Sequence, residues 1–218
     1  MTIDNSDEFV LASASPRRRQ ILRRLGVRLR IDPSRLPEPE RRRGESPIDY
    51  ARRLAVLKAR EVGLRHRQGY VIGADTIVVV RGRILGKPRT EEEARGMLRQ
   101  LQGGWHEVVT AVCLFDAASR RTRSGWSRSR VHMRRLSPVE LDWYVGTAEY
   151  RDKAGAYAIQ GYGALLVDRL EGCFFNVVGF PVVTFLKLCQ RFGVQLIPAP
   201  SGRRSSGRRG VRSGTNPT

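Results

Sequence analysis

Helix-start signatures that alternate with short apolar runs limit this chain to folds in which helices and strands follow one another. Ser15-Pro16 and Ser46-Pro47 each place a hydroxyl before a first-turn proline, and Thr90 with Glu93 forms a third start signature. Runs typical of strands cover residues 9–12, 27–31, 70–74, 77–80, 106–115, 122–136 and 164–170. This alternation predicts an α/β chain in which a mixed, twisted sheet is flanked by helices.

The same pattern predicts where the helices end and where the chain turns. The expected helices cover residues 16–25, 47–62, 90–102, 138–145 and 177–192. Arg81-Gly82 predicts a tight turn, and the proline- and charge-rich segment 32–45 predicts a loop. We expect residues 9–197 to form one folded domain.

The two ends of the chain differ from this domain in composition. Residues 198–218 are rich in Ser, Gly, Pro and Arg and contain no acid, which predicts a disordered basic tail. Residues 1–8 carry acidic but no basic side chains, which predicts a flexible N-terminus and argues against a signal peptide. No apolar run is long enough to span a bilayer, so we expect a cytoplasmic protein without a membrane partner.

The chain is strongly basic, with 40 Lys and Arg residues against 21 Asp and Glu residues and a net charge of +19. Most of these cations are arginines spread along the whole chain, which is more typical of a codon-usage bias than of one binding face. The charge still attracts anions over long distances, so nucleotides, polyphosphates and nucleic acid are the partner classes that it favours.

The spacing of cysteines and histidines excludes several kinds of site. The cysteines are odd in number and lack CxxC spacing, which excludes a disulfide scaffold and a cysteine zinc site. The histidines, which are His66, His106 and His132, stand apart from one another, which excludes a histidine metal site and a Ser-His-Asp triad. We expect each histidine to be a surface or sheet residue.

Lys58 interrupts the apolar stripe of the second expected helix. It lies four residues after Leu54 and seven after Ala51, so it shares their side of the helix. One interpretation is a lysine at the edge of the stripe, whose ammonium reaches water. The other is a lysine aimed into an anion-binding cleft, because a buried ammonium needs an anion as partner.

The loop before the first expected helix has the features of a phosphate cradle. Arg17 and Arg18 open this helix, where backbone N–H groups already favour anions. Ser13 and Ser15 add hydroxyl donors. The loop is not a P-loop, since the G-x-x-x-x-G-K-[ST] pattern is absent. The alternative is that both arginines are simply solvated.

Asp75 lies within the apolar run 71–80, although aspartate is disfavoured in strands. Carboxylates at strand ends often hold metals or act as bases in α/β proteins, and the alternative is an aspartate that caps a turn. Lys87 follows on a Gly-Lys-Pro turn. Gln160, in a segment of small residues, offers both an amide donor and an acceptor.

Together these residues provide what the hydrolysis of a triphosphate requires. Positive charge for the phosphates is available from Arg17, Arg18, Lys58 and Lys87. Asp75, with Glu38 from the preceding loop, could hold a divalent metal ion and orient water. Thr76 and Gln160 could contact the edge of a base.

At these residues the chain resembles the Maf family, the septum formation inhibitor-like nucleoside triphosphate pyrophosphatases. The matching segments are residues 11–18, 44–47, 54–59, 73–76, 86–88, 152–161 and 176–181. The resemblance runs from about Val10 to Gly193. In the segment 36–39 it rests on Glu38 alone, and Cys173 and Phe174 depart from the family pattern.

The resemblance implies a two-lobed α/β fold around a deep nucleotide-binding cleft, similar to that of inosine triphosphatases. It implies hydrolysis of a nucleoside triphosphate to the monophosphate and pyrophosphate with Mg²⁺ or Mn²⁺. Asp75 matches the family's proton acceptor, and substrate choice is implied at Arg17, Thr76 and Gln160. Arginine at position 17 and glutamine at position 160 match the branch that acts on dTTP and UTP.

The resemblance also implies a homodimer, action on modified pyrimidine nucleotides in pool cleaning, and a role in the arrest of cell division. Two other functions stay open on the sequence: a nucleic-acid-binding protein that uses the basic tail, and a catalytically silent regulator of division that keeps a nucleotide pocket. Aromatic residues do not interleave with basic ones as they do in stacking platforms, which disfavours nucleic-acid binding.

Overall fold

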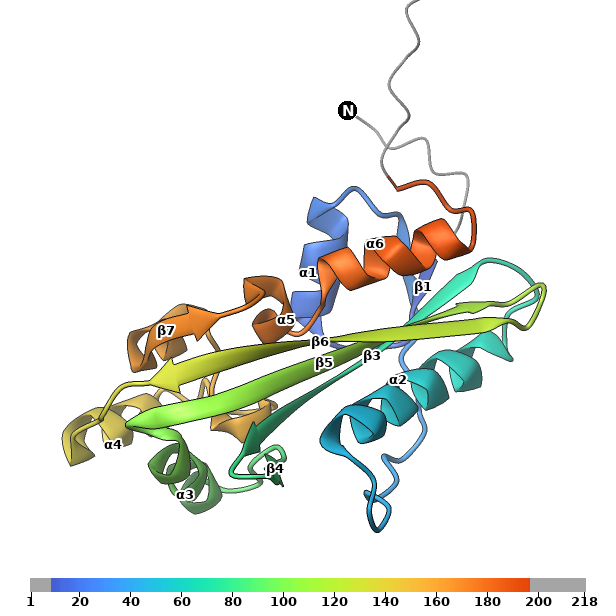
Figure 1. Cartoon of the computed structure of the whole chain (residues 1–218). Coiled ribbons are helices and arrows are strands. Elements are labelled where there is room, and N and C mark those ends of the chain that lie inside the picture. The colour runs from blue at the N-terminus through green and yellow to red at the C-terminus, as the bar shows by residue number, and fades with distance from the viewer. Residues whose placement is uncertain (1–8, 197–218) are drawn as a thin grey trace, which may run out of the picture.

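The computed structural model describes residues 9–196, which form a mixed sheet flanked by helices (Figure 1). The strands are β1 (Phe9–Leu11), β2 (Leu29–Ile31), β3 (Tyr70–Val80), β4 (Arg83–Leu85), β5 (Gly104–Asp116), β6 (Thr122–Met133) and β7 (Val167–Glu171). Their order in the seven-stranded sheet is β2-β1-β3-β5-β6-β7, and β4 pairs with β3. β1 runs parallel to β2 and β3, and the other pairs are antiparallel. The predicted fold class is confirmed.

The first four helices begin within one residue of the predicted positions. They are α1 (Pro16–Arg24), α2 (Pro47–Gly63), α3 (Glu91–Leu101), α4 (Pro138–Gly146), α5 (Phe174–Val178) and α6 (Val182–Arg191), with 3₁₀ turns at Ala154–Ala156 and Gly161–Leu166. The hydroxyls of Ser15, Ser46 and Thr90 each accept a hydrogen bond from the backbone N–H three residues later. These caps satisfy donors that the first turn would otherwise leave unpaired.

Several predicted boundaries are wrong. β2 begins at Leu29 instead of residue 27, and β6 ends at Met133 instead of residue 136. Residues 70–80 form one strand instead of two, because β3 pairs with β5 along its length and holds Asp75 opposite Ala111. The expected helix 177–192 is two helices, since Gly179, in the left-handed region at φ 117°, ends α5 and Pro181 precedes α6. Residues 164–166 belong to a 3₁₀ turn before β7.

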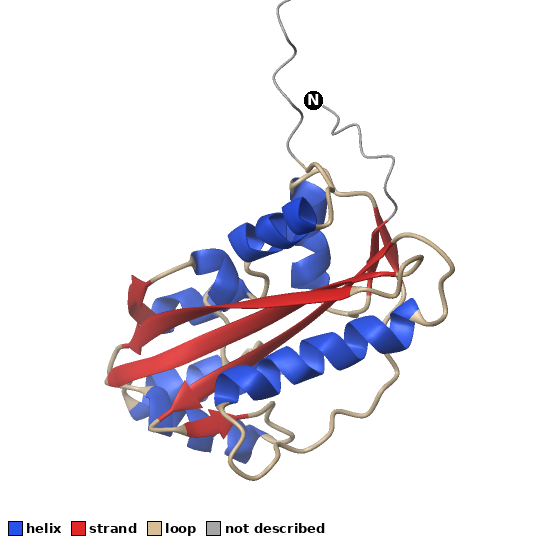
Figure 2. Cartoon of the chain, turned by 45° about the vertical axis from the view of Figure 1, so that its right-hand side comes forward, coloured by secondary structure: helices blue, strands red, loops and turns tan. Residues whose placement is uncertain are grey.

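One face of the sheet packs against α2 (Figure 2). Alternate residues of β3 point to this face, and Val71, Ile77 and Val79 form a buried cluster with the alanines of α2. Gly73 lies between them, and a Cβ atom there would be 2.2 Å from the carbonyl oxygen of Ala55. The absence of a side chain at position 73 therefore sets the short spacing between α2 and β3.

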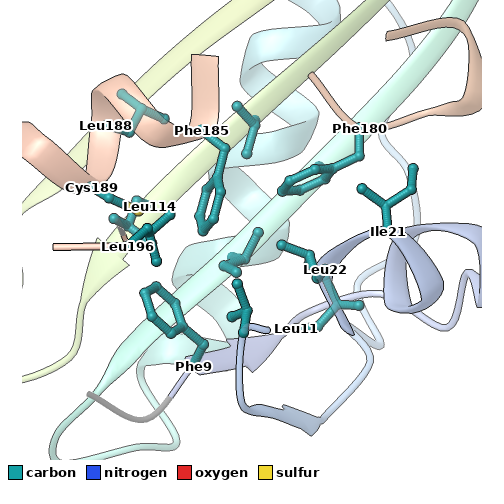
Figure 3. Close-up of a cluster of buried hydrophobic side chains, with 14 of the residues drawn as sticks. Phe9, Leu11, Ile21, Leu22, Leu114, Phe180, Phe185, Leu188, Cys189 and Leu196 are labelled. Carbon is teal, nitrogen blue, oxygen red and sulfur yellow. The ribbon is translucent and has the colours of Figure 1, made fainter. Parts of the chain in front are cut away.

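The opposite face carries two buried clusters, which form two lobes. The first cluster joins β1, α1 and α6 through side chains that include Phe9, Leu22 and Phe185 (Figure 3). A fully buried phenylalanine contributes roughly 2 kcal/mol of hydrophobic stabilisation. The second cluster joins β4, α3 and α4 and includes Leu98 and Tyr144. The long strands β3 and β5 contribute residues to both clusters.

The predicted flexible N-terminus, residues 1–8, and the predicted basic tail, residues 198–218, lie outside the described residues. Within residues 9–196, no helix combines the length and apolar character needed to cross a membrane.

Candidate active site in an opening of the sheet

An opening in the sheet beside β3 places backbone and side chains of this strand at the surface of a cleft. β5 follows one edge of β3, whereas the other edge pairs with β1 at Tyr70–Ile72 and with β4 at Val78–Val80. Between these two pairings no strand of the described chain adjoins residues 73–77. The carbonyl oxygen of Ala74, in this interval, accepts a hydrogen bond from Nη1 of Arg18 at 2.9 Å.

The opening leads into a cleft of about 600 Å³ that brings together every site residue predicted from the sequence. Those residues are Ser13, Ser15, Arg17, Arg18, Glu38, Lys58, Asp75, Thr76, Lys87 and Gln160. They come from the loop before α1, the first turn of α1, the loop before α2, α2 itself, β3, the turn after β4 and the segment before the second 3₁₀ turn. Segments far apart in the sequence thus meet where the strand pairing of β3 is interrupted.

Asp75, Lys58 and Glu38 form a charged triplet in the cleft. Nζ of Lys58 lies 2.7 Å from Oδ1 of Asp75 and 2.6 Å from Oε1 of Glu38. Asp75 is buried, with 6% of its surface exposed. Lys58 therefore points into the cleft and meets anions there, as the second interpretation of its position in the helix predicts.

The surroundings shift the pKa values of both carboxyl groups. Burial raises the pKa of Asp75, and the charges of Lys58 and Arg18 oppose this effect. Burial acts in the same direction on Glu38, but its hydrogen bond to Lys58 and the nearby positive charges lower the pKa of Glu38 overall. A carboxylate with a raised pKa accepts a proton more readily, which suits Asp75 to act as a base.

Arg18 is held by the protein on all sides. Its Nε donates to the carbonyl oxygen of Gly179, its Nη1 to Oγ of Ser13 and to Ala74, and its Nη2 to Oγ1 of Thr76. These bonds tie α1 to β3 and to the link between α5 and α6. The sequence predicts that Arg18 is a cation for phosphate. In the structure, the N–H groups of its guanidinium already donate hydrogen bonds within the protein.

Three other predicted residues have side chains without hydrogen-bond partners in residues 9–196. They are Arg17, Lys87 and Gln160, all of which line the cleft. Burial lowers the pKa of Arg17, and the charges of Asp152 and Glu149 oppose this effect. The donors of these side chains are thus available to an anionic ligand.

The sequence analysis does not assign Lys153, which lines the cleft, or Glu149, which supports a turn next to it. Lys153 lines the cleft, and burial together with the neighbouring charge of Arg17 lowers its pKa. Oε2 of Glu149 accepts a hydrogen bond from the N–H of Gly163, in the turn that follows Gln160. Lys153 lies in the segment 152–161, and its charge in that segment could have identified it as a site residue from the sequence. No local pattern identifies Glu149.

His106 is a buried residue of β5, so the expectation of a sheet residue is confirmed for it. Its Nε2 lies 2.6 Å from the hydroxyl of Tyr157, which lines the cleft. Burial lowers the pKa of His106 to about 4. The imidazole is therefore neutral at pH 7 and supports the cleft wall.

The donor set of the cleft fits a divalent cation that is bound together with phosphate. Residues 9–196 contain no group of three or more His, Cys, Asp or Glu side chains that could hold a metal ion alone. Asp75 and Glu38 converge on one ammonium group, so two carboxylates are available at one place. Mg²⁺ is commonly held by one or two carboxylates plus substrate phosphates and water.

Comparison with known proteins identifies the family of the chain. A sequence profile described as Maf-like protein matches residues 8–192. This chain belongs to the Maf-like protein family. Proteins named dTTP/UTP pyrophosphatase are similar to this family member along most of its length. The one from Pelotomaculum thermopropionicum is 44% identical over 190 residues, which cover 87% of this chain and 99% of that protein.

Relatives from other organisms also carry the name dTTP/UTP pyrophosphatase and match most of the Maf-like chain. The dTTP/UTP pyrophosphatase of Pyrococcus furiosus is 42% identical over 183 residues, which cover 84% of this chain and 94% of that protein. A crystal structure of a nucleoside-triphosphatase (dITP/XTP pyrophosphatase) from Mycobacterium abscessus aligns with a TM-score of 0.39 at 20% identity, over 59% of this chain and 75% of that one. This structural likeness is too weak to support an inference.

Proposed function

We propose that this protein hydrolyses dTTP and UTP to the nucleoside monophosphate and pyrophosphate. The observation that carries the proposal is the buried carboxylate of Asp75, which is bonded to Lys58 in the same cleft as Arg17 and Lys87, two cations without a hydrogen-bond partner among residues 9–196. Family membership and the names of relatives that match nearly the whole domain support the same reaction.

In the proposed reaction a water oxygen forms a bond to the α phosphorus while the bond to the bridging oxygen breaks and pyrophosphate leaves. Oδ1 of Asp75 bonds to Lys58, whereas Oδ2 accepts no hydrogen bond from residues 9–196. Oδ2 is therefore the atom that takes the proton of the attacking water. Arg17 and Lys87 neutralise the phosphates and hold them in line for attack.

We propose that Asp75 and Glu38 hold a divalent cation, Mg²⁺ or Mn²⁺, jointly with the substrate phosphates. When bound, the cation supplies positive charge for the phosphate oxygens. Lys58 lies between the two carboxylates, favours their ionised forms and holds them close together in the absence of substrate.

A panel of ordinary and modified nucleoside triphosphates, assayed with Mg²⁺ or Mn²⁺, tests the proposal. We expect equal amounts of monophosphate and pyrophosphate, with dTTP, UTP and modified pyrimidine nucleotides as the best substrates. Release of inorganic phosphate instead of pyrophosphate would contradict cleavage at the α phosphorus. The same turnover after chelation of divalent ions would contradict the role of the metal.

We also propose that the protein is a homodimer, as the family resemblance implies, and that it is located in the cytoplasm, as the sequence analysis predicts. Light scattering of the full-length protein tests the first, and fractionation of cells tests the second. A salt-titrated gel shift with and without residues 198–218 tests nucleic-acid binding: hydrolysis that survives removal of the tail would make any such binding secondary to the enzyme activity.

A further inference from the structure

The outer edge of β6 is only partly covered by another strand. β5 pairs with one side of β6 along its whole length, whereas β7 pairs with the other side only at residues 130–133. Within the described chain, residues 122–129 of this outer edge therefore adjoin no strand. An uncovered edge presents backbone donors and acceptors to solvent. The side chains around this edge then decide what can bind there.

A shallow hollow of about 390 Å³ lies at this uncovered edge. Figure 1 shows α6 and α2 on opposite faces of the sheet beside β6. The residues that line this β6 hollow include Arg52 of α2, Gly125 and Trp126 of β6, and Thr184, Lys187 and Arg191 of α6. A Cβ atom at position 125 would lie 2.6 Å from Cγ2 of Thr184, so the strand and α6 can approach closely only because Gly125 has no side chain. None of the lining residues also lines the cleft that contains Asp75, so the hollow is a separate site.

The β6 hollow is lined by positive side chains and by no acidic side chain of the described residues. Arg52, Lys187 and Arg191 are all exposed. Arg52 lies 3.5 Å from a carboxylate oxygen of Asp49, in a solvent-exposed ion pair that contributes little. Lys187 and Arg191 have no hydrogen-bond or ion-pair partner among residues 9–196. An anionic ligand would relieve the repulsion between these cations.

Trp126 adds a flat aromatic surface beside the cations. Its side chain is 41% exposed, although an indole gains stability from burial. Bases of single-stranded nucleic acid stack on such rings while neighbouring cations bind the phosphates. Spacing along the sequence conceals this arrangement, because Arg52, Trp126 and Arg191 come from three separate elements. The tertiary structure thus builds a stacking platform that the sequence does not predict.

The positive charge continues beyond the β6 hollow. Arg123 is exposed on the same uncovered stretch of β6. In the sequence, α6 is followed by residues 198–218, which carry five arginines. Charged side chains beside a strand edge can serve only to discourage pairing with another strand, but that role does not require an exposed indole. A row of cations beside an open hollow suits a chain of phosphates better than a single anion.

We propose that the β6 hollow binds single-stranded nucleic acid, with a base stacked on Trp126 and the backbone phosphates bound by Arg52, Lys187 and Arg191. Stacking and phosphate contacts do not read a sequence, so the site accepts any base. The inference does not depend on the proposed hydrolysis, because the hollow and the cleft share no residue.

Fluorescence anisotropy with a labelled thymidine oligonucleotide of about 12 nucleotides tests the inference on the full-length protein. Trp126→Ala should weaken binding about tenfold, because one base loses its stacking partner. The matched control is Trp143→Ala in α4, which removes an indole that is 45% exposed and lies outside the hollow. This control should bind like the wild type.

A second pair of variants separates the β6 hollow from the overall charge of the protein. Arg191→Ala should weaken binding and reduce the slope of log affinity against log salt by about 0.7, the value for one phosphate contact of a single strand. Arg99→Ala removes the same charge from an exposed position of α3 and should change neither quantity. Equal effects of the two substitutions would mean that only net charge attracts the oligonucleotide, which overturns the inference.

Three further outcomes also overturn the inference. The first is equal affinity of Trp126→Ala and Trp143→Ala for the oligonucleotide. The second is binding of dTMP as tight as that of the oligonucleotide, which would indicate a mononucleotide site. The third is tighter binding of an oligoglutamate peptide that depends on Trp126, which would indicate an acidic peptide. Circular dichroism checks the fold of each variant, and Trp126→Leu, which keeps apolar bulk without a ring, replaces Trp126→Ala if the latter does not fold.

Discussion

Nζ of Lys58 lies 2.7 Å from Oδ1 of Asp75, so a lysine of α2 contacts a carboxylate on the face of β3 that packs against this helix. The contact depends on Gly73, which allows the backbone of α2 to approach the strand. Removing either charge leaves the other partly desolvated beside Glu38 and Arg18, and such groups are costly to leave unpaired. The predictions below concern this contact and the residues that support it.

Asp75→Asn should lower kcat by 10²- to 10⁴-fold, because the amide cannot take the proton of the attacking water. The amide oxygen still accepts a hydrogen bond from Lys58, so the variant should fold. Steady-state kinetics and circular dichroism measure the two properties. Turnover equal to that of the wild type would remove Asp75 from the mechanism.

Arg18→Lys should lower the free energy of unfolding by about 2 kcal/mol, since a lysine cannot replace the bonds to Gly179, Ala74 and Thr76 together. The matched control is Arg17→Lys, whose guanidinium has no protein partner among the described residues. This control should raise KM and leave stability nearly unchanged. Urea unfolding of both variants checks the contrast, and similar stability losses would show that Arg18 has no special structural role.

Gly73→Ala should lower the free energy of unfolding by about 3 kcal/mol or more and reduce turnover. The added Cβ atom meets backbone atoms of α2, at 2.2 Å from Ala55 and 2.7 Å from Ala59, so the helix must move away with Lys58. Gly96→Ala in α3 is the control: nothing lies within 4 Å of the added Cβ, and alanine should stabilise that helix slightly. Equal stability of the two variants would be evidence against close α2–β3 packing.

His106→Gln should change how stability depends on pH. Burial lowers the pKa of His106 to about 4, from 6.5, so the unfolded chain binds a proton more readily than the native protein does. Stability from the neutral imidazole is complete above pH 6.5 and falls as the pH decreases toward 4. Between pH 7 and pH 5 the wild type should lose about 2 kcal/mol relative to the variant. Urea unfolding at both pH values measures this difference, and parallel losses would mean that His106 titrates normally.

Gln160→Ala should alter the ranking of nucleotide bases more than it alters stability. Its amide lines the cleft without a protein partner among residues 9–196, so truncation breaks no internal hydrogen bond. Relative kcat/KM values for UTP, dTTP, CTP and GTP measure the effect. A ranking identical to that of the wild type would separate Gln160 from base recognition.

Local patterns in the sequence were sufficient to predict the starts of α1, α2, α3 and α4 and the residues that meet in the cleft. The caps at Ser15, Ser46 and Thr90 involve residues three positions apart, so short segments contain the whole signal. Lys58 could be recognised because helical periodicity places it on the apolar side of α2. Family resemblance then added roles that spacing alone does not provide.

Long-range pairing explains what the sequence did not predict. Asp75 has low strand propensity, and only its pairing with β5 keeps β3 continuous there. The bond between Asn176 and Val108 joins residues 68 positions apart, so no local pattern contains it. The role of Arg18 in holding three segments together likewise depends on tertiary structure. The break at Gly179 and Pro181 does have a local signal, because a proline ends or kinks a helix, and the predicted helix over 177–192 crosses that proline.

The continuity of β3 and β5 also determines how the protein receives its ligand. Both strands pass beneath the two lobes, and they stay paired from Tyr70 opposite Asp116 to Val79 opposite Glu107. A hinge between the lobes would have to bend this ladder and break its bonds, so a nucleotide enters a preorganised site whose width is already set. Little free energy is then spent on closure, and small-angle scattering should give the same radius of gyration with and without nucleotide.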